Sequence, residues 1–187
     1  MSLSDFRTPL RFVSAAATAT TTVAKLTKRR KLQRVAKMLI VPPLIDYRDP
    51  LMVLGGLGHA AGDLVLLRKN RKLEQGAACF AAGHAAMILC QVRRGVRPQY
   101  PWVHAGLWLA AVPLIRDPKL LAYGALLAAY SSYSRSLGGP LFVLSDALII
   151  ANKRFPHPLL DAAVTVTYGS AQLMLFAPDE SSYRQVN

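Results

Sequence analysis

The stretch GAACFAAGHAAMILC, residues 76–90, predicts a helix that is apolar on every side. Only His84 interrupts its run of apolar and small residues, and the stretch GGPLFVLSDALIIAN, residues 138–152, has the same character. A helix on the surface of a water-soluble bundle needs a broad polar stripe, and neither stretch has one. Small residues also suit close helix packing in lipid. The two stretches therefore favour a membrane protein, although a charged fraction of 18% leaves a soluble helical bundle as the alternative.

Similar apolar runs recur along the whole chain of 187 residues, at 9–24, 35–46, 50–67, 75–92, 100–115, 119–134, 137–152 and 159–177. A helix needs about 20 residues to cross the hydrocarbon layer, so most runs are short but sufficient. The second run contains Pro42 and Pro43, which predict either a kinked span or a re-entrant piece. We predict an all-α fold, a polytopic membrane helical bundle of about eight transmembrane helices, forming one integral membrane domain over residues 1–187.

The formal net charge of +13 indicates a membrane surface rather than a nucleic acid. The 23 Lys and Arg residues lie mostly in short clusters between the apolar runs, and no single helix face is basic. If all eight runs cross, most cations fall on one side, in loops 25–34, 68–72, 116–119 and 153–154. The positive-inside rule puts these loops in the cytoplasm and both termini outside. We expect a multi-pass protein of the cell (plasma) membrane, with no nucleic-acid partner.

Several polar residues lie within the apolar runs, where charge is costly and side chains face the bundle interior. They are Lys37, His59, Asp63, His84, Ser145, Asp146, Asn152, Tyr168 and Gln172. His59 and Asp63 are four residues apart, on one helix face, and Tyr168 and Gln172 repeat this spacing. A single buried histidine is more often a packing residue than a catalyst. Two carboxylates and a lysine in separate runs instead predict a shared polar cavity, because isolated charges are hard to bury.

Asp63 and Asp146 are the candidate catalytic pair. Burial and a nearby Lys37 act in opposite directions on a carboxyl group, so the two aspartates can hold different protonation states. One would serve as general acid and the other as general base toward water. This arrangement predicts hydrolysis of a substrate that already lies in the bilayer, and it leaves open which aspartate is the acid.

Three stretches resemble the YhhN family of multispanning membrane proteins. They are KMLIVPPLI (37–45), GLGHAAGDLVLL with GAACFAAGHAAM (56–87), and GGPLFVLSDALIIANKRF with TYGSAQLML (138–175). The family includes lysoplasmalogenases, which hydrolyse the vinyl ether of lysoplasmalogens to a fatty aldehyde and a glycerophospho-base. The chain departs from the family at Met38, where the family has proline, and at His59, where it often has serine.

The resemblance implies roles for residues at matching positions. The family's Gly-Asp falls on Gly62 and Asp63, its Ser-Asp on Ser145 and Asp146, and its further positions on Gly76, Phe80, His84, Asn152, Tyr168 and Gln172. A vinyl ether is cleaved by protonation of its outer carbon and attack of water on the resulting oxocarbenium ion, and paired carboxyl groups meet both needs. The resemblance thus implies Asp63 and Asp146 as catalytic residues of a lysoplasmalogenase-like hydrolase. The expected substrate-binding or positioning residues are Lys37, His84, Asn152, Tyr168 and Gln172.

Other functions remain open from the sequence. An intramembrane aspartyl protease also uses two buried carboxylates, and a metal-dependent lipid amidase could use His59, Asp63 and His84. A small transporter or lipid-binding membrane protein is the non-enzymatic alternative. Cys79 and Cys90 have neither metal-ligand nor disulfide spacing. We expect a lysophospholipid or ether lipid as substrate, no metal and no cofactor.

Overall fold

The computed structural model describes residues 3–68 and 73–176, and every regular element in these ranges is helical. Eight α-helices follow one another: α1 (Leu3–Leu26), α2 (Arg30–Met38), α3 (Pro50–Leu66), α4 (Leu73–Arg93), α5 (Pro101–Ala111), α6 (Pro118–Tyr133), α7 (Gly138–Arg154) and α8 (Pro158–Leu175). Two 3-10 turns, η1 (Pro42–Leu44) and η2 (Val112–Leu114), follow α2 and α5. The all-α prediction is confirmed, and each apolar run corresponds to one helix or to a helix with its 3-10 turn.

Helix starts are set by proline and by capping side chains. Proline occupies the first position of four helices: α3, α5, α6 and α8. Proline has no N–H and its fixed φ suits this position. Asp49 accepts hydrogen bonds from the amides of Leu51 and Met52, and Asp117 accepts one from Lys119. Each of these starts therefore follows from local sequence.

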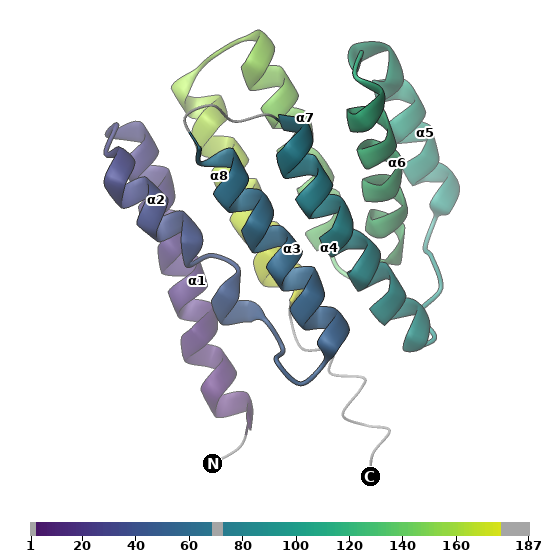
Figure 1. Cartoon of the computed structure of the whole chain (residues 1–187), viewed down its shortest axis with the longest axis horizontal. Coiled ribbons are helices and arrows are strands. Elements are labelled where there is room, and N and C mark those ends of the chain that lie inside the picture. The colour runs from purple at the N-terminus through teal and green to yellow at the C-terminus, as the bar shows by residue number, and fades with distance from the viewer. Residues whose placement is uncertain (1–2, 69–72, 177–187) are drawn as a thin grey trace.

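The helices form an up-and-down bundle (Figure 1). The α3–α4 and α7–α8 hairpins lie at its centre. On one side α1 packs against α8, and α2 packs on α1 and α3; on the other side α6 packs against α4 and α7, and α5 packs on α6. Helix α1 begins and α8 ends at the same end of the bundle (Figure 1). The turns after α1, α5 and α7 lie at the opposite end, so these predicted cation-rich loops share one end of the molecule.

The second apolar run is broken rather than continuous. Helix α2 has nine residues and ends before Pro42 and Pro43, and η1 continues the chain against α1. Ile40 is fully buried, and its carbonyl oxygen accepts a hydrogen bond of 2.6 Å from Ser14 Oγ on α1. A side chain of α1 therefore satisfies a carbonyl that the proline break leaves free.

Helices α3 and α4 approach closely through glycine. A Cβ atom at Gly58 would lie 2.7 Å from both the Cα and the amide nitrogen of Gly83. Such a contact with backbone cannot be relieved by a rotamer change, so glycine is needed at this crossing. The close crossing fixes the relative position of His59 and His84, each the next residue after one of these glycines.

An ionic contact joins α3 and α4 at the end opposite the cation-rich turns. Asp49 Oδ2 accepts hydrogen bonds from Arg94 at 2.8 Å and from Cys90 Sγ at 3.2 Å. Partial burial by itself would raise the pKa of Asp49, but the hydrogen bonds from Cys90, the Leu51 amide and Arg94 outweigh burial and hold it below its usual value. The Asp49 side chain thus caps α3 and binds the end of α4.

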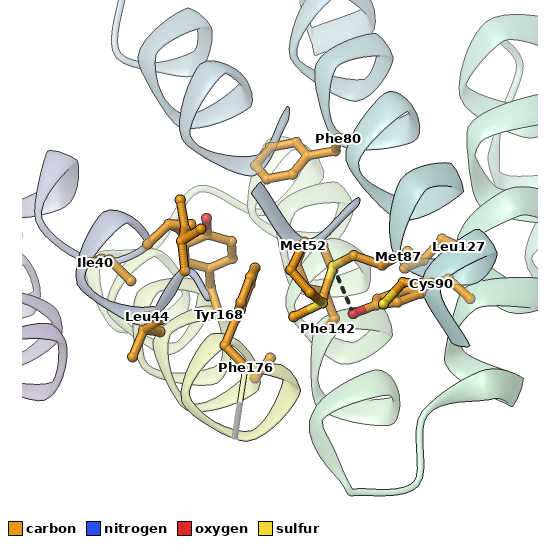
Figure 2. Close-up of a cluster of buried hydrophobic side chains, with 14 of the residues drawn as sticks. Ile40, Leu44, Met52, Phe80, Met87, Cys90, Leu127, Phe142, Tyr168 and Phe176 are labelled. Carbon is orange, nitrogen blue, oxygen red and sulfur yellow. Dashed lines mark hydrogen bonds between the residues drawn. The ribbon is translucent and has the colours of Figure 1, made fainter. Parts of the chain in front are cut away.

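The core is a cluster of aromatic and aliphatic side chains at the meeting of the central hairpins. Figure 2 shows Phe80 and Met87 of α4, Phe142 of α7, Tyr168 of α8 and Phe176 after α8 converging there. The Phe142 ring centroid lies 5.8 Å from that of Phe80 and 5.6 Å from that of Tyr168. Aromatic packing of this kind orders the side chains that surround the polar residues described below.

The bundle buries several polar side chains beside its apolar core and exposes many large apolar side chains. Buried polar side chains come from six of the helices: Ser14, Thr18, Thr21, His59, Asp63, His84, Ser131, Ser132, Ser145, Thr165 and Gln172. Large apolar side chains are exposed, including Phe12 at 70%, Trp102 at 85% and Leu114 at 74%. Helix α5 has no buried residue although its sequence is apolar. Within the described residues, one helix, α4, is long and apolar enough to cross a membrane by itself, and α3 is apolar but shorter.

Candidate active site

Three of the predicted site residues meet at one point in the bundle. Lys37 Nζ of α2 lies 3.0 Å from Asp63 Oδ1 of α3, and Tyr168 Oη of α8 donates a hydrogen bond of 2.6 Å to Asp63 Oδ2. Lys37 Nζ also lies 4.8 Å from the centroid of the Tyr168 ring. Asp63 is only 2% exposed, so its carboxylate has a cation on one oxygen and a phenol on the other. Lys37 thereby stabilises the ionised form of Asp63.

Asp146 of α7 lies in a different environment. Its Oδ2 accepts a hydrogen bond of 2.6 Å from Tyr123 Oη of α6. Asp146 lines a cavity of about 150 Å³ whose walls are mostly apolar and include Phe80, Trp108 and Leu127. The ion pairs of the described residues do not include Asp146. Apolar walls and the absence of a lysine in contact favour the protonated form of this carboxyl group, whereas the hydrogen bond from Tyr123 acts in the opposite direction.

A chain of hydrogen bonds crosses the core behind Asp146. The side chain of Gln172 lies 3.1 Å from His59 Nδ1, and His59 Nε2 lies 3.1 Å from His84 Nδ1. His84 Nε2 in turn lies 3.5 Å from Tyr123 Oη. Gln172 is one helical turn from Tyr168, which binds Asp63. The surroundings of both aspartates are therefore linked through adjacent polar side chains.

Phe80 lies between the two aspartate sites. Its ring centroid is 6.1 Å from that of Tyr168 and 5.5 Å from that of His59, and its side chain lines the cavity of Asp146. Gly62, which precedes Asp63, faces the same ring, because a Cβ there would lie 2.5 Å from a ring carbon of Phe80. Phe80 occupies a position implied by the family resemblance, and it contacts the surroundings of both aspartates.

A second and larger cavity opens at the cation-rich end of the bundle. It has a volume of about 1410 Å³ and is lined by Lys37, Asn152 and several further charged residues: Lys25, Glu74, Asp117, Lys119, Lys153 and Asp161. Leu66, Leu73 and Ile149 line both cavities. Asp146 lines the apolar cavity and Lys37 lines the polar one, while Asp63 lines neither, so these two cavities of the described residues do not form the predicted shared polar cavity.

The remaining predicted residues have their own partners. Asn152 Oδ1 accepts a hydrogen bond of 3.0 Å from the amide of His157, so Asn152 orders the turn after α7 and does not reach the aspartates directly. Ser145 Oγ donates to the carbonyl of Val164 and joins α7 to α8. His59 and Asp63 both face the interior, as their spacing predicts, but they bind different partners: His59 binds Gln172 and His84.

Tyr123 is a site residue that the sequence does not identify. It lies near the start of an apolar run, seven residues before Tyr130, a spacing that places the two phenols on one helix face. Its position could have been suspected because a tyrosine inside an apolar run has a hydroxyl that must find a partner. His59 also does more than share a helix face with Asp63, because its two ring nitrogens contact Gln172 of α8 and His84 of α4 and so join these helices.

The positions of His59, Asp63 and His84 test the alternative of a metal-dependent lipid amidase. Asp63 contacts Lys37 and Tyr168 rather than the two histidines, and His59 and His84 bind each other. Across the residues that the structure describes, no three His, Cys, Asp or Glu side chains gather as potential metal ligands. The donor set of His59, Asp63 and His84 therefore does not converge on one point.

Comparison with known proteins adds no family assignment. No protein-family model, no curated protein and no solved structure matches the chain.

Proposed function

We propose that the protein is a multispanning membrane hydrolase of the lysoplasmalogenase type, related to the YhhN family, in which Asp63 and Asp146 cleave the vinyl ether bond of a lysoplasmalogen or a related ether lysolipid. The observation that carries the proposal is the contrast between the contacts of these two carboxyl groups. Each accepts a hydrogen bond of 2.6 Å from a tyrosine, but only Asp63 has a lysine beside it. Acid and base roles require such a contrast.

The distribution of polar and apolar residues supports insertion in a membrane. Histidines, carboxylates and hydroxyl groups are buried, while large apolar side chains such as Phe12, Trp102 and Leu114 are exposed. In water such a surface is unfavourable, whereas in lipid it is the expected one. Close crossings through small residues, as at Gly58 and Gly83, suit packing in lipid too. The short helices α3 and α6 reach most of the way across a hydrocarbon layer of about 30 Å.

Asp146 is the general acid in this proposal and Asp63 the general base. Lys37 at 3.0 Å keeps Asp63 ionised and able to accept a proton from water. Asp146 has apolar surroundings and no lysine in contact, so its carboxyl group can carry the proton that the vinyl ether needs. This division of roles follows from the contacts of each carboxyl group.

The two cavities suit the two halves of the substrate. The apolar cavity at Asp146 fits the part of the alkenyl chain next to the ether, and the larger polar cavity fits the glycerophospho head group, with Lys37 available to the phosphate. The vinyl ether joins these two halves. It would lie near Leu66, Leu73 and Ile149, which line both cavities.

The reaction proceeds by proton transfer and addition of water. Asp146 gives its proton to the outer vinyl carbon, which leaves an oxocarbenium ion at the carbon bonded to oxygen. Water attacks this carbon and gives its proton to Asp63, which forms a hemiacetal. The hemiacetal hydroxyl gives its proton to Asp146, the bond between the hemiacetal carbon and the glycerol oxygen breaks, and that oxygen takes the proton from Asp63, so the products are a fatty aldehyde and the free glycerophospholipid hydroxyl. Both carboxyl groups return to their initial protonation states.

The test uses Asp63→Asn and Asp146→Asn in detergent-purified protein, with Asp49→Asn as the matched control at the far end of the bundle. Asparagine caps helices about as well as aspartate, so the control retains its helix start. We expect the wild type and the control to release aldehyde from a lysoplasmalogen. Each site variant should lose at least about a hundredfold in rate, because general acid or base catalysis contributes about 10²- to 10⁴-fold.

Three other outcomes would contradict the proposal. Turnover retained in either site variant would remove that aspartate from the mechanism. Release of fatty acid from an ester lysophospholipid or from ceramide, without aldehyde from the vinyl ether, would indicate a different hydrolase. No product from any of these lipids would favour the transporter or lipid-binding alternative.

A further inference from the structure

The hydrogen-bond chain from Gln172 to Asp146 joins five helices of the bundle. Its members are Gln172 of α8, His59 of α3, His84 of α4, Tyr123 of α6 and Asp146 of α7. Gln172, His59 and His84 have no exposed surface. The two imidazoles present four ring nitrogens, and each of these nitrogens has a partner within the chain. A buried polar chain is costly unless it is satisfied in this way.

The chain has one consistent direction when Asp146 is ionised. A carboxylate has no hydrogen, so Tyr123 donates to Asp146 Oδ2 and its oxygen accepts from His84 Nε2. Neutral imidazole has one N–H, so His84 Nδ1 accepts from His59 Nε2. His59 Nδ1 then accepts from the amide nitrogen of Gln172. All four hydrogens point toward Asp146, and both histidines are Nε2–H tautomers.

This direction determines where a proton on Asp146 can reside. Tyr123 occupies Oδ2 as a donor, and the histidines behind it hold its hydroxyl in that orientation. While Tyr123 donates to Oδ2, a proton added to Asp146 resides on Oδ1. Asp146 lines the apolar cavity, so its carboxyl group is within reach of a substrate there. A general acid works only when its proton faces the reacting atom.

We propose that Tyr123, His84, His59 and Gln172 are positioning residues that keep the acidic proton of Asp146 on Oδ1, facing the apolar cavity. This inference rests on the proposed function for its effect on rate, but the direction of the chain can be measured without substrate. It gives His59 a role that its spacing to Asp63 does not suggest, and it gives a role to Tyr123, which the sequence does not identify as a site residue. It also replaces the expectation that His84 and Gln172 contact water or substrate.

Titratable and charged groups near the chain come from the surrounding helices. His104 of α5 lines the same cavity as Asp146, Tyr130 of α6 stacks on His84 with ring centroids 4.5 Å apart, and Tyr168 with Lys37 lies beyond Phe80. Tyr130 Oη donates to Met87 Sδ and is not a member of the chain. Tyr130 therefore provides a matched control on the same helix and against the same imidazole.

The activity test compares Tyr123→Phe with Tyr130→Phe. Each change removes one phenol hydroxyl and keeps the ring. We expect Tyr123→Phe to lower kcat at least about tenfold with KM changed less than about twofold, because the loss affects proton delivery and not binding. Tyr130→Phe should keep kcat within about twofold. Adding His84→Gln to Tyr123→Phe should cost little more, since residues that act as one unit are not additive.

The structural test uses nitrogen-15 NMR of histidine-labelled protein in a His104→Gln, His157→Asn background, which leaves His59 and His84. We expect both to be neutral Nε2–H tautomers, and Tyr123→Phe to change the His84 signals more than those of His59. An Nδ1–H tautomer at either residue would overturn the proposed direction. Equal kcat in Tyr123→Phe and Tyr130→Phe would overturn the positioning role. If the wild type releases no aldehyde, the proposed function fails. The histidine tautomers then still test the direction of the hydrogen-bond chain, because they are measured without substrate.

Discussion

At the scale of single residues, Asp63 and Asp146 differ in the groups that contact their carboxyl oxygens. Asp63 has Lys37 and Tyr168 on its two oxygens, whereas Asp146 has Tyr123 on one oxygen and an apolar cavity beside it. A buried ion pair is costly to break because the remaining charge is left without compensation. Lys37 is therefore expected to matter for stability as well as for chemistry.

Replacing Lys37 by methionine should destabilise the protein by about 3–5 kcal/mol, the usual cost of removing one partner of a buried pair. The double variant Lys37→Met with Asp63→Asn should recover much of this loss, because no unpaired charge remains. Thermal or denaturant unfolding in detergent measures both effects. A Lys37→Met protein as stable as the wild type would mean that the pair contributes little, and it would weaken the argument that Asp63 is held ionised.

The sequence predicts part of this site and misses part. Lys37, Asp63 and Tyr168 are expected inside because charged and polar groups in apolar runs face the interior, and the structure brings the three together. The partnership of Tyr123 with Asp146 could not be predicted, because it depends on how α6 crosses α7 and no local pattern encodes that crossing. For the same reason, the spacing of His59 and Asp63 predicts that they lie on one helix face, but it does not predict that they bind different partners.

At the scale of helices, two kinds of local feature hold α3 and α4 together. One is the close approach of Gly58 and Gly83, and the other is Asp49, which caps α3 and binds Arg94. Since His59 and His84 follow these glycines in sequence, the helix crossing fixes the distance of 3.1 Å between the two imidazoles. The geometry of the polar chain thus depends on the packing of one hairpin.

Gly58→Ala should destabilise the α3–α4 hairpin by about 1–3 kcal/mol, the usual cost of overpacking, because the added methyl would meet the Gly83 backbone. Gly106→Ala on α5 is the matched control, since a Cβ there meets nothing within 4 Å. The control should be neutral or more stable by up to about 1 kcal/mol, in line with helix propensity. Unfolding midpoints in detergent compare the two. Equal midpoints for both variants would contradict the close crossing.

Helix boundaries follow well from the sequence, and helix breaks follow less well. Proline at the first turn and aspartate at the cap mark the starts of α3 and α6. Pro42 and Pro43 predict an interruption, but the sequence leaves open how it is resolved. The structure resolves it through a hydroxyl of α1, because Ser14 binds the carbonyl of Ile40. A contact between residues 26 positions apart is not encoded in local pattern.

At the scale of the whole molecule, buried polar groups, exposed apolar groups and cation-rich turns at one end form a consistent arrangement. The apolar runs predict the number of helices, because each run is bounded by proline, glycine or charge. They do not predict that the α3–α4 and α7–α8 hairpins face each other, since this pairing is set by contacts between distant residues such as Tyr168 and Asp63.

If the bundle crosses a membrane with its cation-rich end in the cytoplasm, its two ends should react from opposite sides. Single cysteines at Arg97, near the other end, and at Arg29 and Arg116, in the cation-rich turns, test this in a background with Cys79→Ala and Cys90→Ala. An impermeant maleimide should label only Arg97→Cys in intact cells and all three after permeabilisation. Labelling of all three in intact cells would contradict a bundle that spans the membrane in this orientation.

The most direct test of acid-catalysed vinyl ether hydrolysis is the mass of the aldehyde formed by the purified protein from a lysoplasmalogen in D₂O. Protonation by Asp146 draws on solvent hydrogen, so the aldehyde should keep every carbon of the alkenyl chain and carry one deuterium on the carbon next to the carbonyl. Asp146→Asn should give no such product above the buffer background. An unlabelled or shortened aldehyde, or no aldehyde from the wild type, would contradict the mechanism.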